Sequence, residues 1–314
     1  MAKKKKKIPA HVDVLAKSAR SCGFKFSKYD TEGALHKVSN GKKEVLINRS
    51  ATEKTSHLSY ILADSKRFTT AILKHFGIAV PRQKQISNYE EAIGFYRKQR
   101  PVVVKPNRAS LGRGVTVNIT NQKQLKKAYR LAKKYGQRVL VEEFVPGDDY
   151  RVTVIDYKHV YVVKRIPAFV VGNGKADIEL LIKRKNRIKE EYKKKIKMGT
   201  KSEKILQEQH LTFDSVPANG EIIYLRKAAN IAEGGTSIDC TDLISKELKQ
   251  LAIRASRILK LPAAGVDILT EDISSKKGVI IEINPRPHIV LHHYPHEGKP
   301  RFPGRDIIRM LFRT

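Results

Sequence analysis

The sequence predicts an α+β fold, and four stretches carry that prediction, two hairpins and two helices. Residues 265–268 and 279–284 are apolar runs of β character on either side of a polar turn, which is typical of a β-hairpin. Residues 102–106 and 115–119 repeat the strand–loop–strand pattern. Residues 122–134 and 245–260 have helical character instead. Hairpin strands combined with separate helices indicate the α+β class.

Composition sets the size and the charge of the molecule. The chain has 314 residues and 40% hydrophobic residues, enough for two or three packed lobes. Lysine and arginine number 63 against 31 aspartates and glutamates, so the formal net charge is +32. This charge favours anionic partners such as nucleotides, acidic peptides or polymers, and nucleic acid. A generally lysine-rich proteome explains it equally well.

The cysteines and the N-terminus bear on location. Cys22 and Cys240 are too few for a disulfide framework and do not have zinc-site spacing, so a reducing cytoplasm is expected. No apolar run approaches the length of a membrane span, which predicts no membrane partner. The lysine tail, residues 1–7, has no apolar segment behind it, so it is no secretory signal and is expected to be disordered.

Residues 8–64 predict a small α/β unit without evident chemistry. Helical spacing covers residues 11–22 and 56–63, and three short strands are expected at 24–26, 35–38 and 45–47. Another helix follows from Lys66 to Gly77, with Asp64 as its expected N-cap. Lys66 lies in the first turn, where the helix dipole disfavours a cation, unless a phosphate binds there.

Three oxygen-bearing side chains lie on the 265–284 hairpin: Asp267, Glu282 and Asn284. Glu282 and Asn284 share a face because strand side chains alternate, and a symmetric turn places Asp267 opposite Glu282. Two carboxylates and an amide on one face next to a core are costly unless a cation binds. These ligands suit Mg²⁺. A solvated face of an edge hairpin is the alternative reading.

The loop between residues 106 and 115 contains glycines that suit a phosphate site. Gly112 and Gly114 allow backbone N–H groups to approach phosphates, Ser110 adds a hydroxyl, and Lys105 supplies charge at the strand end. It is not a Walker A loop, because no Gly-Lys pair in the chain is followed by Ser or Thr. An ordinary hairpin turn explains these residues as well.

Other patterns leave alternatives open. Residues 139–145 form a strand that ends at Pro146-Gly147. The free backbone N–H and C=O groups at its edge could hydrogen-bond to an adenine. Residues 183–204 are highly charged and predict an exposed, largely helical insertion, either a solvated face or a nucleic-acid patch. His288 and His292 have the spacing of zinc ligands on a helix, but a substrate-pocket loop is the favoured interpretation.

Ordered motifs resemble a known family. These motifs lie at 102–106, 110–114, 141–147, 165–168, 171–174, 214–221, 225–230, 234–235, 237–242, 265–267, 282–284 and 293–299. On these motifs the chain is similar to the ATP-grasp carboxylate–amine ligases, in particular to the ATP-grasp half of bifunctional glutathione synthase and the ligase module of cyanophycin synthetase.

The resemblance implies an ATP-grasp fold, two α/β lobes that clasp ATP, preceded by a small α/β pre-ATP-grasp unit. It places that unit at 8–64, the N-terminal lobe with its glycine-containing lid at 65–144, and the C-terminal lobe with the Mg²⁺ and substrate sites at 145–314. It also implies a homo-oligomer.

The resemblance assigns roles residue by residue. Metal ligands are Asp267, Glu282 and Asn284, for Mg²⁺ with Mn²⁺ as an alternative. ATP contacts are Lys66, Lys105, Ser110, Gly112, Gly114, Glu142, Glu143, the backbone at Val145, and Asp149 for the ribose. Arg165, Arg226 and Asn230 form the catalytic and substrate set.

The implied activity is ATP-dependent joining of a carboxylate to an amine through an acyl phosphate. The substrates expected are ATP, an amino-acid, γ-glutamyl or acidic-peptide carboxylate, and an amine acceptor. A ligase that modifies an acidic polymer or protein tail is the alternative within the class, and the positive charge favours such a polyanionic substrate. A non-catalytic nucleotide- or nucleic-acid-binding protein on the same fold is the alternative from another class.

Overall fold

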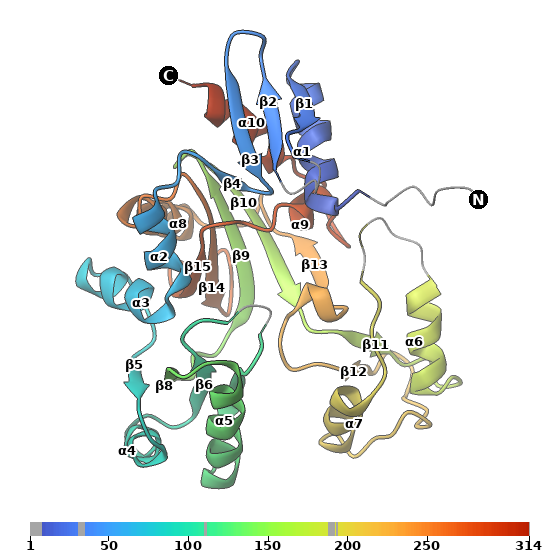
Figure 1. Ribbon diagram of the computed structural model, residues 1–314. Coiled ribbons are helices and arrows are strands. Elements are labelled where there is room, and N and C mark those ends of the chain that lie inside the picture. The colour runs from blue at the N-terminus through green and yellow to red at the C-terminus, as the bar shows by residue number, and fades with distance from the viewer. Residues whose placement is uncertain (1–7, 31–34, 110–111, 188–191, 193, 314) are drawn as a thin grey trace. The chain divides into compact units, whose positions relative to one another are not determined.

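The computed structural model describes residues 8–30, 35–109, 112–187, 192 and 194–313 (Figure 1). The chain forms two compact units from discontinuous segments. Unit 1 comprises Met1–Pro81, Tyr150–Val163 and Asp239–Thr314, and unit 2 comprises Arg82–Asp149 and Lys164–Ile238. The domain boundaries expected at 8–64, 65–144 and 145–314 stay a prediction. No helix within the described ranges is long and apolar enough to cross a bilayer.

Unit 1 begins with one helix and a four-stranded antiparallel sheet, which confirms the predicted small α/β element. The elements are α1 (Ala10–Ser21), β1 (Lys25–Lys28), β2 (His36–Ser39), β3 (Glu44–Asn48) and β4 (Ala51–Thr52), and the strands pair in that order. Val45 and Ile47 of β3 are buried while their neighbours are exposed, because one face of the sheet covers a core. The C-terminal helix α10 (Pro303–Phe312) packs on α1.

Two helices follow, α2 (His57–Asp64) and α3 (Lys66–His75). The prediction that Asp64 caps the second helix was wrong by one residue, since Asp64 ends α2. Ser65 is the N-cap, and its hydroxyl accepts the backbone N–H of Phe68 at 3.4 Å. Lys66 lies in the first turn of α3, as expected.

The predicted 265–284 hairpin is confirmed as β14 (Ala263–Thr270) paired with β15 (Val279–Asn284). These strands belong to a sheet of order β13-β10-β9-β14-β15, which also contains β9 (Asp148–Ile155), β10 (His159–Ile166) and β13 (Thr236–Asp239). Strands β9, β10 and β13 cross the boundary between the units. Helices α8 (Lys246–Ile258) and α9 (Val290–His293) complete unit 1.

Unit 2 contains an antiparallel sheet of order β5-β8-β6-β7. Its strands are β5 (Gln83–Ile86), β6 (Val102–Pro106), β7 (Thr116–Ile119) and β8 (Val139–Glu143). Helices α4 (Tyr89–Gln99) and α5 (Gln122–Tyr135) share a core with this sheet, so the predicted strand–loop–strand and the helix after it are confirmed. Leu125, Ala128 and Ala132 are the buried residues of α5.

The remainder of unit 2 differs from the prediction in the charged stretch at 183–204. It contains β11 (Phe169–Val171), α6 (Ile178–Arg187), α7 (Thr200–Gln207), β12 (Ile222–Tyr224) and the 3₁₀ turn η1 (Ile231–Glu233). The predicted helical, exposed insertion at 183–204 was wrong at residues 194–199, which are not helical. Ile196 is only 4% exposed and packs in a core with Leu206 and Ile223, so burial overrides the charged composition around it. Residues 188–191 and 193 lie outside the described part, as does the lysine tail.

Helix α10 begins against a buried histidine of α9. The backbone N–H of Gly304 donates to Nε2 of His293 at 3.2 Å, which requires a neutral ring with a lone pair on that nitrogen. Burial, reinforced by Arg305 and Lys17, lowers the pKa of His293 to about 4. Protonation therefore removes the acceptor at the start of α10.

We predict that His293→Gln weakens the dependence of stability on pH. The folded pKa lies below the model-peptide value of 6.5, so the unfolded chain binds more protons between pH 6.5 and pH 4. Stability is therefore full above about pH 6.5 and falls toward pH 4. At ~1.4 kcal/mol per pKa unit, this histidine removes about 2 kcal/mol by pH 5.

Urea unfolding at pH 7 and pH 5 measures the effect. The loss between the two pH values should be smaller in His293→Gln than in the wild type, whereas His75→Gln, at an exposed position, should behave like the wild type. Equal losses in all three proteins would show that His293 does not couple α10 to pH.

Candidate functional site

Unit 1 brings the three predicted metal ligands onto one face of the β14–β15 hairpin. Asp267 lies directly across from Glu282, and Asn284 lies across from Gly265. The side chains therefore share one face, as the sequence predicted. Asp267 is 3% exposed, while Glu282 and Asn284 are partly exposed. A buried carboxylate in this position requires a compensating charge.

Two cations provide that compensation. Arg151 of β9 donates from Nε and Nη2 to the two carboxylate oxygens of Asp267, the latter bond being 3.1 Å long. Lys66 Nζ lies 2.9 Å from Glu282 Oε1. A Cβ atom at Gly265 would lie 3.1 Å from Arg151 Cδ, which explains the glycine opposite Asn284.

Arg151 is the residue of this set that sequence reasoning missed. It lies 116 residues from Asp267 in the chain, and nothing in its local spacing indicates a link to the hairpin. The sequence does contain one signal for Arg151. Side chains alternate between the two faces of a strand, so the strand pattern of residues 151–155 places Arg151 and Thr153 on one face. Burial of a cation among apolar neighbours implies an anionic partner.

The donor chemistry of this face fits Mg²⁺. Two carboxylates and an amide oxygen are the hard oxygen ligands that Mg²⁺ prefers. Asn284 donates from Nδ2 to the Gly265 carbonyl at 3.4 Å, so its amide orientation is tied to the hairpin backbone. Lys66 and Arg151 keep the charge of the face near balance before any metal binds.

A second buried polar contact lies on β9. Thr153 Oγ1 is 2.8 Å from Nε2 of His292, which is fully buried. Burial, together with the charge of Arg151, holds the pKa of His292 well below its usual value, so the ring is neutral. His288 precedes α9 and packs edge-on against His11, so it does not share a helix with His292. Within the described ranges, no three His, Cys, Asp or Glu side chains form a metal-binding group.

Unit 2 brings Lys105 and Glu142 together. Lys105 Nζ lies 2.6 Å from Glu142 Oε1, and each side chain is only 6% exposed. The strands β6 and β8 that carry them are adjacent. Gln83 of β5 donates to the other carboxylate oxygen at 2.9 Å. Such a buried pair costs desolvation energy, which suggests a role beyond stability.

The glycine-containing loop connects β6 to β7. Gly112 and Gly114 have φ values of 69° and 73°, in the left-handed region that favours glycine. A Cβ atom at Gly114 would lie 3.0 Å from the ring of Tyr135, so the loop packs closely on the end of α5. Ser110, the predicted hydroxyl ligand, lies outside the described residues.

The predicted adenine contacts lie at the end of β8 and just beyond it, and the predicted ribose contact lies in β9. Glu143 accepts the backbone N–H of Arg82 at 3.0 Å, and Val145 lies beyond the end of the strand. Asp149 is bound by Arg165, with Nη2 and Nε at 2.5 and 3.0 Å from Oδ1. The residues predicted for ribose and for catalysis are therefore partners here.

Arg226 is held by its own unit. It is 8% exposed and donates to Glu233, to Ser202 and to the backbone carbonyls of Leu225 and Lys197. These bonds brace the segment before α7. A catalytic role for Arg226 requires that it leave some of these partners.

Asn230 shapes the predicted substrate loop. Its side chain accepts the backbone N–H of Ala232 at 2.9 Å and caps η1. Gly234 ends that turn with a φ of 94°, and a Cβ atom there would lie 2.6 Å from Ile196 Cγ1. This loop therefore packs on Ile196, a residue of the unit 2 core.

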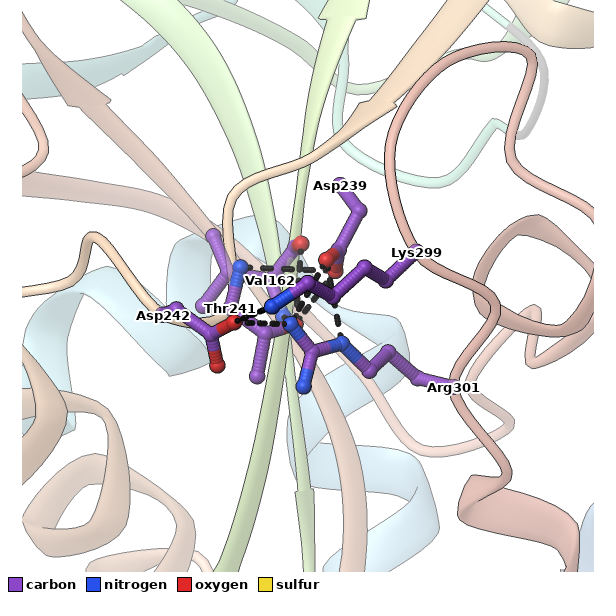
Figure 2. Close-up of polar contacts among 6 residues, drawn as sticks. All are labelled: Val162, Asp239, Thr241, Asp242, Lys299 and Arg301. Carbon is purple, nitrogen blue, oxygen red and sulfur yellow. Dashed lines mark hydrogen bonds and ion pairs between the residues drawn. The ribbon is translucent and has the colours of Figure 1, made fainter.

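Unit 1 also joins two motifs that carried the family resemblance (Figure 2). Arg301 binds Asp239 at 2.9 Å and Asp242 at 2.6 Å, and Lys299 binds Asp242 at 3.1 Å. Thr241 donates to Asp239 at 2.6 Å. The bonds from Arg301 and Lys299 lower the pKa of Asp242. The cluster fixes residues 239–242 to residues 297–301.

We predict that Arg151→Met destabilises the fold strongly, because Asp267 loses two guanidinium hydrogen bonds while it stays buried. Breaking one side of a buried ion pair typically costs about 3–5 kcal/mol. The double variant Arg151→Met/Asp267→Asn should recover part of that loss, since the charge is removed with its partner. Denaturant unfolding of the two single variants and the double variant measures the coupling. Additive losses would mean that the pair does not stabilise the hairpin.

Comparisons with known proteins show which domain families two parts of the chain match and which proteins the chain is similar to. Residues 64–168 match the family described as phosphoribosylglycinamide synthetase, ATP-grasp (A) domain, and residues 225–293 match the RimK-like ATP-grasp domain. The glutathione biosynthesis bifunctional protein of Clostridium perfringens is 34% identical over 314 residues, covering 95% of this chain and 40% of the relative. Cyanophycin synthetase of Trichormus variabilis is 36% identical over 291 residues, covering 88% and 32%.

Solved structures of ATP-grasp ligases share the fold of this chain. The crystal structure of a bifunctional glutathione synthetase from Pasteurella multocida has a TM-score of 0.72 and 28% identity, covering 96% of this chain and 44% of that one. D-alanine–D-alanine ligase from Bacillus anthracis, at 14% identity and a TM-score of 0.51, covers 82% and 68% and shares the fold alone. The chain spans less than half the length of the curated relatives described above. The two domain matches and the structural likeness show that this chain contains ATP-grasp domain regions and has the ATP-grasp fold.

Proposed function

We propose that this chain is an ATP-dependent carboxylate–amine ligase that works through an acyl phosphate. The observation that carries the proposal is the pairing of Asp267 with Glu282 across the β14–β15 hairpin, with Asn284 on the same face and Lys66 bound to Glu282. The similarity to proteins named for glutathione biosynthesis and cyanophycin synthesis supports the same class of reaction.

Asp267, Glu282 and Asn284 would hold Mg²⁺, with Mn²⁺ as an alternative. Bound there, the ion would offset the negative charge of the nucleotide phosphates as a Lewis acid. The protein residues orient the ligands: Arg151 fixes the carboxylate of Asp267, and Lys66 fixes that of Glu282. This support should matter because small displacements of metal ligands reduce affinity.

The nucleotide contacts are assigned residue by residue. Lys66 and Lys105 would contact phosphates. Lys105 would do so while it stays paired with Glu142, whose carboxylate offsets part of its positive charge. The backbone at Gly112 and Gly114, with Ser110, would close over the γ-phosphate and exclude water. We assign adenine to Glu142, Glu143 and the Val145 backbone, and ribose to Asp149.

In the reaction, a carboxylate oxygen of the substrate attacks the γ-phosphorus and ADP leaves. The amine then attacks the acyl carbon, loses a proton, and phosphate departs as the C–N bond forms. Arg165 and Arg226 would stabilise the negative charge on the reacting oxygens, and Asn230 would line the substrate pocket. Arg165 already has one carboxylate partner, Asp149. Binding of ribose to Asp149 would release the Arg165 guanidinium to stabilise the reacting oxygens.

The preferred substrate is an amino-acid, γ-glutamyl or acidic-peptide carboxylate. A ligase for an acidic polymer or protein tail is the second candidate, because the net charge of +32 would attract such a chain. A homo-oligomer in the cytoplasm completes the proposal. A non-catalytic nucleotide-binding protein is the alternative from another class.

We predict that Glu282→Gln abolishes turnover of ATP without unfolding the protein, because a carboxylate that binds the metal is replaced by an amide of the same shape. Losing one group that stabilises developing charge typically costs about 100-fold or more in rate. The matched control is Glu271→Gln, an exposed position in the turn of the same hairpin. ADP release and circular dichroism provide the readouts, and normal turnover in Glu282→Gln would remove the metal assignment.

The decisive experiment is ADP release from MgATP over pools of amino acids, γ-glutamyl peptides and acidic peptides, with mass spectrometry of the products. ADP that appears only with one carboxylate–amine pair, with a product lighter than the pair by one water, would identify the reaction. ATP binding without ADP release from any pool, acidic polymers included, would favour the non-catalytic alternative.

A further inference from the structure

Helix α5 of unit 2 exposes a continuous positive surface. We call it the α5 basic face, and it consists of Lys123, Lys126, Lys127, Arg130, Lys133 and Lys134, all exposed. At about 100° per residue, these six side chains fall within an arc of roughly 120°. The opposite side of the helix is buried in the core of the unit through Leu125, Ala128 and Ala132. The positive face is therefore fixed in direction by packing.

The face contains no opposing charge. Helix α5 has no acidic residue, and none of its six cations takes part in an ion pair with another residue in the described part of the chain. Nor does the sequence contain any Asp or Glu between Lys105 and Val141. The cations consequently repel one another, and Lys123 also opposes the helix dipole in the first turn.

The positive surface continues past the end of the helix. Arg108, Arg113 and Arg138 are exposed in the segments beside it. The backbone N–H of Asn107 donates to the Arg138 carbonyl at 2.9 Å, and a Cβ atom at Gly136 would lie 3.9 Å from the Arg108 carbonyl oxygen. The loop and the helix end are thus in contact within unit 2.

A lysine-rich composition alone does not explain this arrangement. On most other helices that carry lysine or arginine, acidic residues are mixed with the basic ones; α3, with three cations and no acidic residue, is an exception. Helix α4 carries Glu90 and Glu91, and in α6 Lys183 pairs with Glu179 at 2.5 Å. Segregation of six cations on one side of α5 therefore points to a bound anion.

The density of charge distinguishes between partners. From Lys123 to Lys134 the helix rises about 16 Å, which gives one cation per ~3 Å. An extended acidic peptide presents side chains on one side only every ~7 Å, or two or three charges over that length. Duplex DNA carries one phosphate charge per ~1.7 Å, about ten over the same length.

We propose that the α5 basic face binds the phosphate backbone of nucleic acid, without sequence preference. The contacts would be lysine and arginine to phosphate, which release counterions and make the affinity strongly dependent on salt. None of the six side chains of the α5 basic face belongs to a residue to which ligase chemistry is assigned, although the loop with Gly112 and Gly114 packs against the end of α5. The proposal therefore does not depend on the function proposed above.

Fluorescence anisotropy with a labelled mixed-sequence DNA duplex of 20 base pairs tests the proposal. The variant Lys123→Gln/Lys127→Gln/Arg130→Gln/Lys134→Gln removes one line of the face, and glutamine preserves helix propensity. The matched control Lys25→Gln/Lys42→Gln/Lys246→Gln/Lys249→Gln removes the same charge at exposed positions of unit 1. Circular dichroism checks folding, and ADP release checks that the ligase reaction is unchanged.

We expect the α5 variant to bind at least tenfold more weakly at 100 mM salt, with the control within about twofold of the wild type. The slope of log affinity against log salt should fall in magnitude by about three to four, close to 0.9 per lost phosphate contact. Equal weakening in both variants, or no binding by the wild type, would overturn the proposal. Displacement of the duplex by polyglutamate at lower charge concentration than by unlabelled duplex would assign the face to acidic peptides instead.

Discussion

The opposition of Asp267 and Glu282 across one hairpin is the constraint on which the rest of unit 1 depends. Two carboxylates placed side by side at the edge of a core repel each other and lose hydration. Two cations from distant segments compensate these charges: Arg151 on β9 and Lys66 in the first turn of α3. Both elements are consequently tied to the hairpin by charge as well as by apolar packing. The same balance leaves room for a divalent cation, because the Glu282 side chain is partly exposed to solvent while its partner Lys66 is buried.

Unit 2 uses the same principle with a single pair. Lys105 and Glu142 are buried on adjacent strands, and Gln83 completes the coordination of the carboxylate. A pair of hydrophobic residues of similar size would stabilise such a position at least as well. Retention of the ion pair is consistent with the nucleotide role proposed for it. In contrast, helix α5 of the same unit has no acidic residue, and its basic face makes no ion pair within the described part of the chain.

Surface and interior charges thus have separate functions in this chain. The interior pairs position side chains with defined geometry, and their effect depends on individual partners such as Arg226 with Glu233. The surface excess acts as a field that salt can screen. The net charge of +32 comes from the surface charges. It therefore affects which partners approach the protein more than it affects the fold.

The sequence by itself determined the hairpins and the amphipathic helices, because these depend on local alternation and turn chemistry. A symmetric turn predicts the pairing of Asp267 with Glu282, but in the structure this pairing depends on a register shift between Asp267 and Ile268, since Ile268 pairs with Ile280. Tertiary structure alone decided which cations meet these carboxylates, since Arg151 is 116 residues away in the chain. It also decided that Ile196, inside a charged stretch, is buried, and that Arg226 is held by Ser202 and Glu233. Such contacts join segments distant in sequence, where burial and charge balance override local composition.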